Sequence, residues 1–98
     1  MDKEQEYKIY EDAIEFFGET SQKVMAIEEM SELTKELCKE LRDRGNVENI
    51  ADELADVEIT LAQIKMIYKI QNLVEEHKDM KLNRFSKRMA ELKSQQSK

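Results

Sequence analysis

Apolar side chains recur every three or four residues through most of the chain, which is the spacing of amphipathic α-helices. The longest series lies in the middle of the chain and consists of Ile50, Leu54, Val57, Leu61, Ile64 and Tyr68. A second series lies beside it and consists of Ala51, Ala55, Ala62 and Met66. Because this segment is apolar over more than one side, we expect a helix that packs against several neighbours.

The pattern and its interruptions predict four helical segments. We expect them at about residues 4–17, from 20 or 21 to 44, from 46–49 to at least 73, and from a weaker break at 75–80 to about 92. Gly18 is predicted to end the first helix in the left-handed conformation, and Gly45 follows the end of the second. Thr20 or Ser21 is predicted to cap the start of the second helix.

The sequence predicts an all-α protein with one domain at residues 1–92 and a disordered tail at 93–98. It contains no proline and two glycines, and it is rich in residues that favour helices. The short connection before the third helix implies an antiparallel helical hairpin. Short flanking helices are too small to cover the third helix alone, so we expect a homodimer or homotetramer that completes a four-helix-type bundle.

The formal net charge of −6 is unevenly distributed. Residues 1–77 carry 9 basic and 20 acidic side chains, whereas residues 78–98 carry 7 basic and 2 acidic ones. An acidic body argues against a nucleic-acid partner, because nucleic-acid binding draws much of its affinity from neutralising phosphates. The basic C-terminal segment could contact the phosphates of a small ligand or pair with the acidic body.

The chain shows no feature of a membrane protein, since its longest apolar run spans only residues 24–27. Its N-terminal residues lack the apolar core of a signal peptide. The single cysteine, Cys38, has no partner for an internal disulfide, and its place in a helical series predicts a buried side chain. A reducing, cytoplasmic setting is consistent with this cysteine content.

Two pairs of acids three residues apart stand beside the apolar series: Glu29 with Glu32, and Glu53 with Asp56. The spacing alone is weak evidence, because an acidic chain of this size yields about five such pairs by chance. These two pairs differ from the rest in lying on stripes that adjoin the predicted packing surfaces. If the hairpin packs through its apolar series, the two stripes face each other at its inner edge.

Four converging carboxylates require a counter-ion, because unpaired charge in a partly dry groove is costly. Oxygen ligands without cysteine or histidine favour Mg²⁺ or Mn²⁺ over zinc. A di-iron bundle is excluded, because the only histidine, His77, does not stand in the required Glu-x-x-His motif. The alternative that the four acids are exposed on a coiled-coil-like hairpin, paired with lysine or arginine, stays open at this point.

The order of these residues resembles the MazG-type, all-α nucleoside triphosphate pyrophosphohydrolases. The resemblance rests on Gln22, the segment EEMSEL at 28–33, a turn that contains glycine, and the segment DELADVEITLAQ at 52–63. That family carries E-x-x-E, a spacer and E-x-x-D, which here correspond to Glu29, Glu32, Glu53 and Asp56. The similarity covers about residues 14–64, with a weaker echo in KLNRFSKR at 81–88.

The resemblance implies hydrolysis of a nucleoside triphosphate between its α and β phosphates, with Glu29, Glu32, Glu53 and Asp56 as catalytic Mg²⁺ ligands. Gln22 lies two helical turns before Glu29 on the same face, where its amide could bind a base edge or a sugar hydroxyl. A polar residue near a helix start, without a ligand, is the alternative interpretation. The basic residues Lys81, Arg84 and Arg88 share one face of the last helix, and the resemblance favours Lys81 and Arg84 as substrate-binding residues. Exposed basic residues without a ligand are the simpler interpretation of that face.

Two further interpretations are compatible with the sequence. The first is a non-enzymatic acidic helical module, such as a dimeric regulator or an inhibitor that mimics nucleic acid. The second is a relative of the enzyme family that binds nucleotides and hydrolyses them slowly. The enzyme requires a metal and loses its function when Asp56 is changed to asparagine. The non-enzymatic module predicts neither effect.

Overall fold

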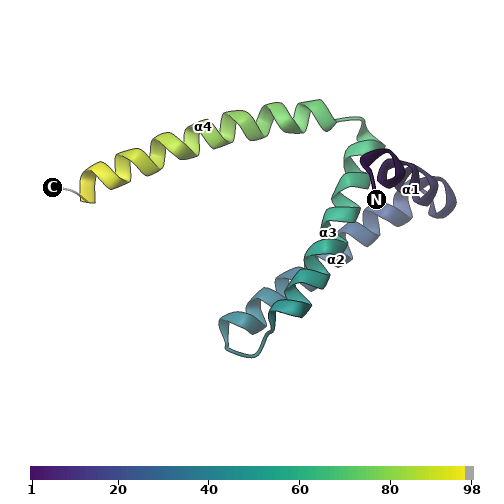
Figure 1. The fold of residues 1–98 in the computed structure, drawn as a ribbon, viewed down its shortest axis with the longest axis horizontal. Coiled ribbons are helices and arrows are strands. Elements are labelled where there is room, and N and C mark those ends of the chain that lie inside the picture. Colours follow the sequence, from purple (N-terminus) through teal and green to yellow (C-terminus); the bar gives the residue numbers. More distant parts are fainter. Residues whose placement is uncertain (97–98) are drawn as a thin grey trace.

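The computed structural model describes residues 1–96, which form four α-helices and no strand (Figure 1). The helices are α1 (Lys3–Phe17), α2 (Glu19–Leu41), α3 (Val47–Tyr68) and α4 (Gln71–Gln96). The prediction of an all-α protein is confirmed. The predicted tail at 93–98 is described only as far as residue 96, where the chain still belongs to α4, and residues 97–98 lie outside the described part.

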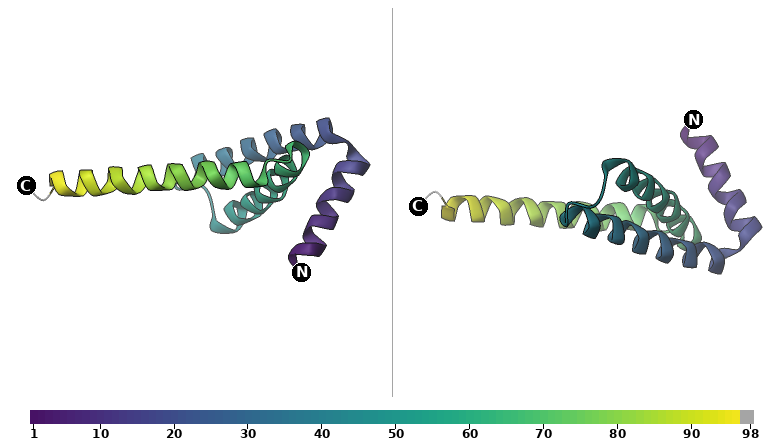
Figure 2. Two further views of the ribbon diagram at one scale, coloured as in Figure 1. Left: turned by 90° about the horizontal axis from the view of Figure 1, so that it is seen from above. Right: turned by 90° about the horizontal axis from the view of Figure 1, so that it is seen from below.

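Helices α2 and α3 form the predicted antiparallel hairpin, and they make the most extensive contact in the molecule (Figures 1 and 2). Helix α1 lies across the open end of this hairpin and contacts both of its helices. Helix α4 contacts only α3 and extends away from the rest. The radius of gyration is therefore 17.6 Å, compared with about 13 Å for a compact chain of this length.

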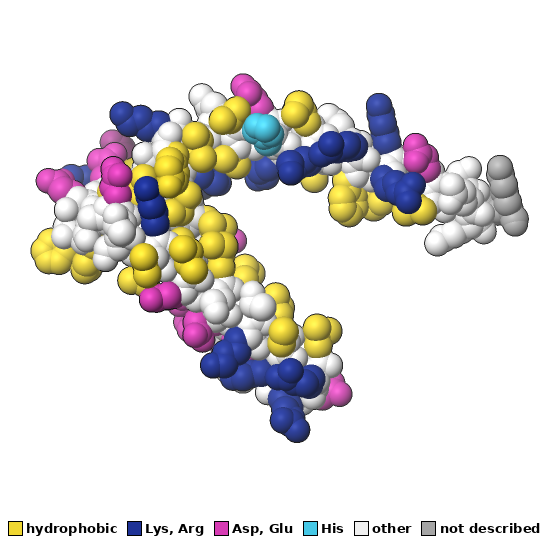
Figure 3. Space-filling view, turned by 180° about the vertical axis from the view of Figure 1, so that it is seen from behind, with side chains coloured by type: hydrophobic (Ala, Val, Ile, Leu, Met, Phe, Trp, Pro, Cys, Tyr) yellow, Lys and Arg dark blue, Asp and Glu magenta, His cyan; other side chains and the backbone are white. Residues whose placement is uncertain are grey.

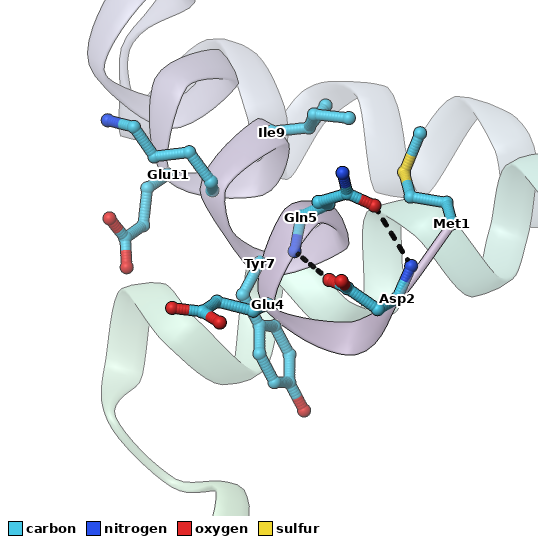
Figure 4. A pocket seen from close by; sticks show the side chains of 8 residues that line it. Met1, Asp2, Glu4, Gln5, Tyr7, Ile9 and Glu11 are labelled. Atoms are coloured by element: carbon cyan, nitrogen blue, oxygen red, sulfur yellow. Dashed lines mark hydrogen bonds between the residues drawn. The ribbon is translucent and has the colours of Figure 1, made fainter.

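Helix α1 begins and ends as its local sequence dictates. The Asp2 side chain accepts a hydrogen bond from the Gln5 backbone N–H, and the Gln5 side chain accepts one from the Asp2 N–H (Figure 4). This reciprocal pair is a capping box. Gly18 ends the helix at φ 93°, outside the left-handed helical region because its ψ is 152°. Helix α2 follows at once without a side-chain cap, so the predicted caps at Thr20 or Ser21 are wrong.

Helix α2 ends at Leu41 instead of the predicted Arg44, because Asp43 adopts a left-handed conformation at φ 59°. The N–H groups of Asp43 and Arg44 then bond back to the carbonyls of Glu40 and Lys39, each at 2.9 Å. These two bonds form a Schellman motif. Gly45 follows this motif, and its lack of a side chain allows a close approach, since a Cβ here would lie 2.8 Å from the Glu40 backbone nitrogen.

Helix α3 ends at Tyr68, so the prediction that it continues to Leu73 is wrong. Lys69 adopts a left-handed conformation at φ 56°, and the Ile70 N–H bonds to the Lys65 carbonyl at 3.0 Å. This is a second Schellman motif, formed without glycine. The predicted break at 75–80 is also wrong, because these residues lie inside α4.

The buried interior of the hairpin is part apolar and part polar, so α2 and α3 pack only in part through their predicted apolar series. Among residues 1–96, the buried hydrophobic side chains are Ala26 and Val57. The buried polar side chains are Gln22, Glu36, Thr60 and Gln63. From the predicted series, Leu54 and Leu61 are instead 44% and 38% exposed. Cys38 is exposed as well, contrary to expectation.

Many large hydrophobic side chains are exposed on the surface of the single chain. Figure 3 shows hydrophobic side chains exposed along the hairpin and along α4. The chain exposes 8190 Å², whereas a compact protein of its mass exposes about 5,800 Å². Large apolar side chains exposed together on a surface are typical of proteins that associate with a partner.

We expect Gly45→Ala to destabilise the protein by about 1–3 kcal/mol, because the added Cβ would collide with the Glu40 backbone. Urea denaturation followed by circular dichroism measures this change. Ser31→Ala, at an exposed position within α2, is the control and should change stability by less than about 0.5 kcal/mol. Equal stability of the Gly45 variant and the wild type would show that the connection has a different conformation.

Candidate acidic site between α2 and α3

A buried hydrogen bond between two amides fixes how α2 and α3 are aligned. Gln22 Nε2 donates to Gln63 Oε1 at 2.6 Å, although the two residues are 41 positions apart. In an antiparallel pair, equal steps from this point along the two helices stay opposite each other. Seven residues from the pair, Glu29 faces Asp56, and ten residues from it, Glu32 faces Glu53.

This alignment brings together acids from both halves of the predicted motif. Glu29, Glu53 and Asp56 each place a carboxylate oxygen within 4.8 Å of the others, and all three side chains are half-buried. Glu32 lies outside this group of three, but its negative charge contributes to raising the pKa of both Glu29 and Glu53. Three of the predicted acids therefore converge, and the fourth stands beside them.

The cluster is electrostatically strained. Burial raises the pKa of Glu29 above its ordinary value of 4.5, and the charge of Asp56 and a hydrogen bond with Asp56 raise it further. Burial also raises the pKa of Glu53, followed by the charges of Asp56 and Glu32. Among residues 1–96, no lysine or arginine forms an ion pair with any of these four acids. Within residues 1–96, the alternative of exposed acids paired with basic residues therefore fits the exposure of Glu32 but not the half-buried Glu29, Glu53 and Asp56.

Three buried polar atoms along the same interface have no hydrogen-bond partner: Gln22 Oε1, Glu36 Oε2 and Glu53 Oε2. A buried polar atom without a partner destabilises a protein by about 1–3 kcal/mol. Of these three residues, Gln22 lines a hollow of about 180 Å³, together with Met25, Glu29, Asp56, Ile59, Thr60 and Gln63. The interface thus offers unused oxygen ligands next to an open space.

The donor set fits a hard divalent cation. Its ligands are carboxylate and amide oxygens, with no histidine or thiol among them, and such ligands suit Mg²⁺ or Mn²⁺. A bound cation would offset the repulsion within the group of three acids. It would also give Glu53 Oε2 the partner that it lacks.

Two residues of the interface were not assigned to the site from the sequence. Gln63 holds Gln22 in place and lines the hollow, and Glu36 is buried and adds its charge to the field at Glu53. Both continue the acidic stripes at helical spacing, Glu36 after Glu29 and Glu32, and Gln63 after Asp56 and Thr60. That periodicity was the available signal, but it does not show that a polar stripe is buried.

The predicted phosphate-binding residues Lys81 and Arg84 do not reach this site within one chain. Both lie on α4, which makes no contact with α2. The aromatic residues Phe16 and Phe17 also lie elsewhere, exposed at the end of α1, with their ring centroids 4.9 Å apart. A larger hollow, about 720 Å³, runs along α1 and contains none of the four acids (Figure 4).

Comparison with known proteins finds no matching family model, no matching curated protein and no matching solved structure. The resemblance to the MazG-type enzymes therefore stays a prediction that rests on the motif residues. Among residues 1–96, no helix has the length and apolar character needed to cross a membrane.

We expect Asp56→Asn to raise the melting temperature by about 2–5 °C near neutral pH with a chelator present, because one of the repelling charges is removed. The raised pKa values of Glu29 and Glu53 mean that the folded state binds more protons than the unfolded state just above pH 4.5. Wild-type stability should therefore fall as the pH rises through those raised values. Thermal melts across this range measure both effects.

The Asp56→Asn advantage should shrink as the pH approaches 4.5, where protonation relieves the repulsion in the wild type. Glu58→Gln is the control, because it removes one negative charge from an exposed position on α3. An equal gain from the control would attribute the effect to net charge and not to the cluster.

Proposed function

We propose that the protein is a Mg²⁺-dependent nucleoside triphosphate pyrophosphohydrolase that cleaves between the α and β phosphates. The observation that supports this most is the convergence of Glu29, Glu53 and Asp56 in a partly buried interface, where they form no ion pair with a lysine or arginine of residues 1–96. These acids come from the two separate halves of the E-x-x-E and E-x-x-D motif. In a hairpin that binds no ligand, the repulsion between these converging acids would lower the stability and nothing would offset it.

In this proposal Glu29, Glu53 and Asp56 hold the divalent cation, and Mn²⁺ is an alternative to Mg²⁺. When bound, the cation neutralises phosphate charge and lowers the pKa of the attacking water. Glu32, or Glu29 itself, orients this water and accepts its proton. Water is thereby added across the bond between the α and β phosphates, giving a nucleoside monophosphate and pyrophosphate.

Gln22 and Gln63 line the part of the hollow that lies beyond the acids. The free Oε1 of Gln22 is a hydrogen-bond acceptor for a base N–H or a sugar hydroxyl. Gln63 keeps the Gln22 amide in a single orientation through the bond at 2.6 Å. This end of the site is therefore suited to bind the nucleoside, while the acids act on its phosphates.

The working form in this proposal is a homodimer or homotetramer. The apolar residues of α2 and α3 that are exposed in one chain include Val24, Ile27, Leu37, Leu54 and Leu61. The chain exposes about 2,400 Å² more than a compact monomer of its mass. Stable interfaces bury about 800 Å² on each partner, so this excess is sufficient for one or more of them.

We expect the wild type to release pyrophosphate from a panel of nucleoside and deoxynucleoside triphosphates with Mg²⁺ and to stop when the metal is chelated. Glu53→Gln should lower the rate by about 100-fold or more, because it removes a charged ligand. Glu58→Gln, on the exposed side of the same helix, should retain wild-type turnover. A coupled pyrophosphate assay measures all three proteins.

Undiminished turnover by Glu53→Gln would remove this residue from the catalytic site. A folded, oligomeric wild type that releases no pyrophosphate from any nucleotide would contradict the enzyme and favour the non-enzymatic acidic module. Stabilisation by Mg²⁺ with a non-hydrolysable nucleotide, without turnover, would instead indicate a protein that binds nucleotides and hydrolyses them slowly.

A further inference from the structure

Helix α2 begins without the side-chain cap that starts α1. Its N-cap is Gly18, which has no side chain to accept a hydrogen bond from the free N–H groups of the first turn. The Gln22 N–H bonds to the Gly18 carbonyl at 3.1 Å, so Gln22 stands at the very start of the helix. Because uncapped helix ends fray, the backbone of α2 alone does not keep the Gln22 side chain in one place.

The end of α3, in contrast, is well capped. Lys69 has a left-handed conformation, and the Ile70 N–H bonds back to the Lys65 carbonyl at 3.0 Å. This Schellman motif directly follows Tyr68, the last residue of α3. The start of α2 and the end of α3 lie beside each other at the open end of the hairpin (Figure 2). A capped helix end is therefore next to an uncapped helix start.

Lys23 connects these two helix ends. Its Nζ lies over the Tyr68 ring, 4.5 Å from the ring centroid, which is the geometry of a cation–π contact. Within residues 1–96, Lys23 forms no ion pair with an acid. The contact and the hydrogen bond from Gln22 to Gln63 start from consecutive residues of α2 and end on the same helix. Lys23 thus anchors the turn of α2 that carries Gln22.

We propose that Lys23 is a positioning residue, which acts through the Tyr68 ring to hold the Gln22 amide at the nucleoside end of the site. Neither Lys23 nor Tyr68 lines the hollow, so both act without touching the nucleotide. The effect on nucleotide binding rests on the function proposed above. The effect on the hydrogen bond between Gln22 and Gln63 does not.

The influence of Lys23 is confined to one end of the hollow. Gln22 is its immediate neighbour, whereas Glu29 lies six residues further along α2 and faces Asp56 across the middle of the hairpin. Loss of the contact should therefore weaken nucleoside binding and leave cation binding unchanged. A general loss of stability would weaken both, so the two effects can be told apart.

Steady-state kinetics with matched variants tests the positioning role. Lys23→Ala and Tyr68→Leu remove the contact, whereas Lys23→Arg and Tyr68→Phe keep a cation and a ring. The first two should raise KM by about two- to fivefold with kcat unchanged, the factor expected from a cation–π contact at an exposed site. The conservative variants should keep the wild-type KM. Lys35→Ala, at an exposed lysine of the same helix, is the control.

A second measurement does not depend on activity. Hydrogen exchange at the Gln22 side-chain amide, followed by NMR, reports its bond to Gln63, which is 2.6 Å long. The exchange should be faster in Lys23→Ala than in the wild type by about the same two- to fivefold. Gln63→Ala, which removes the acceptor, gives the rate of the unbonded amide, and Tyr68→Leu repeats the test from the other helix.

Unchanged exchange in both Lys23→Ala and Tyr68→Leu would overturn the positioning role, as would a loss of kcat without a rise in KM. Faster exchange in a protein that hydrolyses no nucleotide supports the positioning of Gln22 and contradicts only the proposed function. Faster exchange with an unchanged KM, in an active protein, would contradict the part of Gln22 in nucleoside binding.

Discussion

The polar interface between α2 and α3 is the constraint on which the other features of this protein depend. A helical hairpin ordinarily buries its apolar stripes and leaves its charges in water, but here four polar side chains are buried beside Ala26 and Val57, whereas Leu54 and Leu61 are exposed. The hydrogen bond between Gln22 and Gln63 sets the alignment of the two helices. That alignment in turn places Glu29 opposite Asp56 and the other acids beside them.

Two consequences follow from a hairpin that buries polar side chains and exposes apolar ones. On the inside, carboxylates repel one another and buried oxygens lack partners, so the interface gains stability when a cation joins it. On the outside, the apolar surface that a stable fold requires is left for other helices to cover. A cation at the acids and a cover over the exposed apolar side chains would each stabilise this hairpin.

Much of this architecture could be predicted from the sequence, and the failures have physical causes. The helical hairpin and the meeting of Glu29 with Glu53 and Asp56 followed from periodicity and from the motif. The helix ends after α2 and α3 were placed wrongly, because Asp43 and Lys69 adopt left-handed conformations that a sequence rarely signals without glycine. The buried side of the hairpin was predicted only in part, since periodicity shows which residues share a face but not which face is turned inward.

A calorimetric titration of the oligomeric wild type with Mn²⁺, with and without a non-hydrolysable nucleoside triphosphate, tests most directly whether the acids of the hairpin hold a cation. Below neutral pH the account predicts saturable binding with release of protons from Glu29 and Glu53, whose pKa values are raised. Binding should be lost in Asp56→Asn and kept in Glu58→Gln. The absence of saturable binding in the wild type, with or without the nucleotide, would contradict the account.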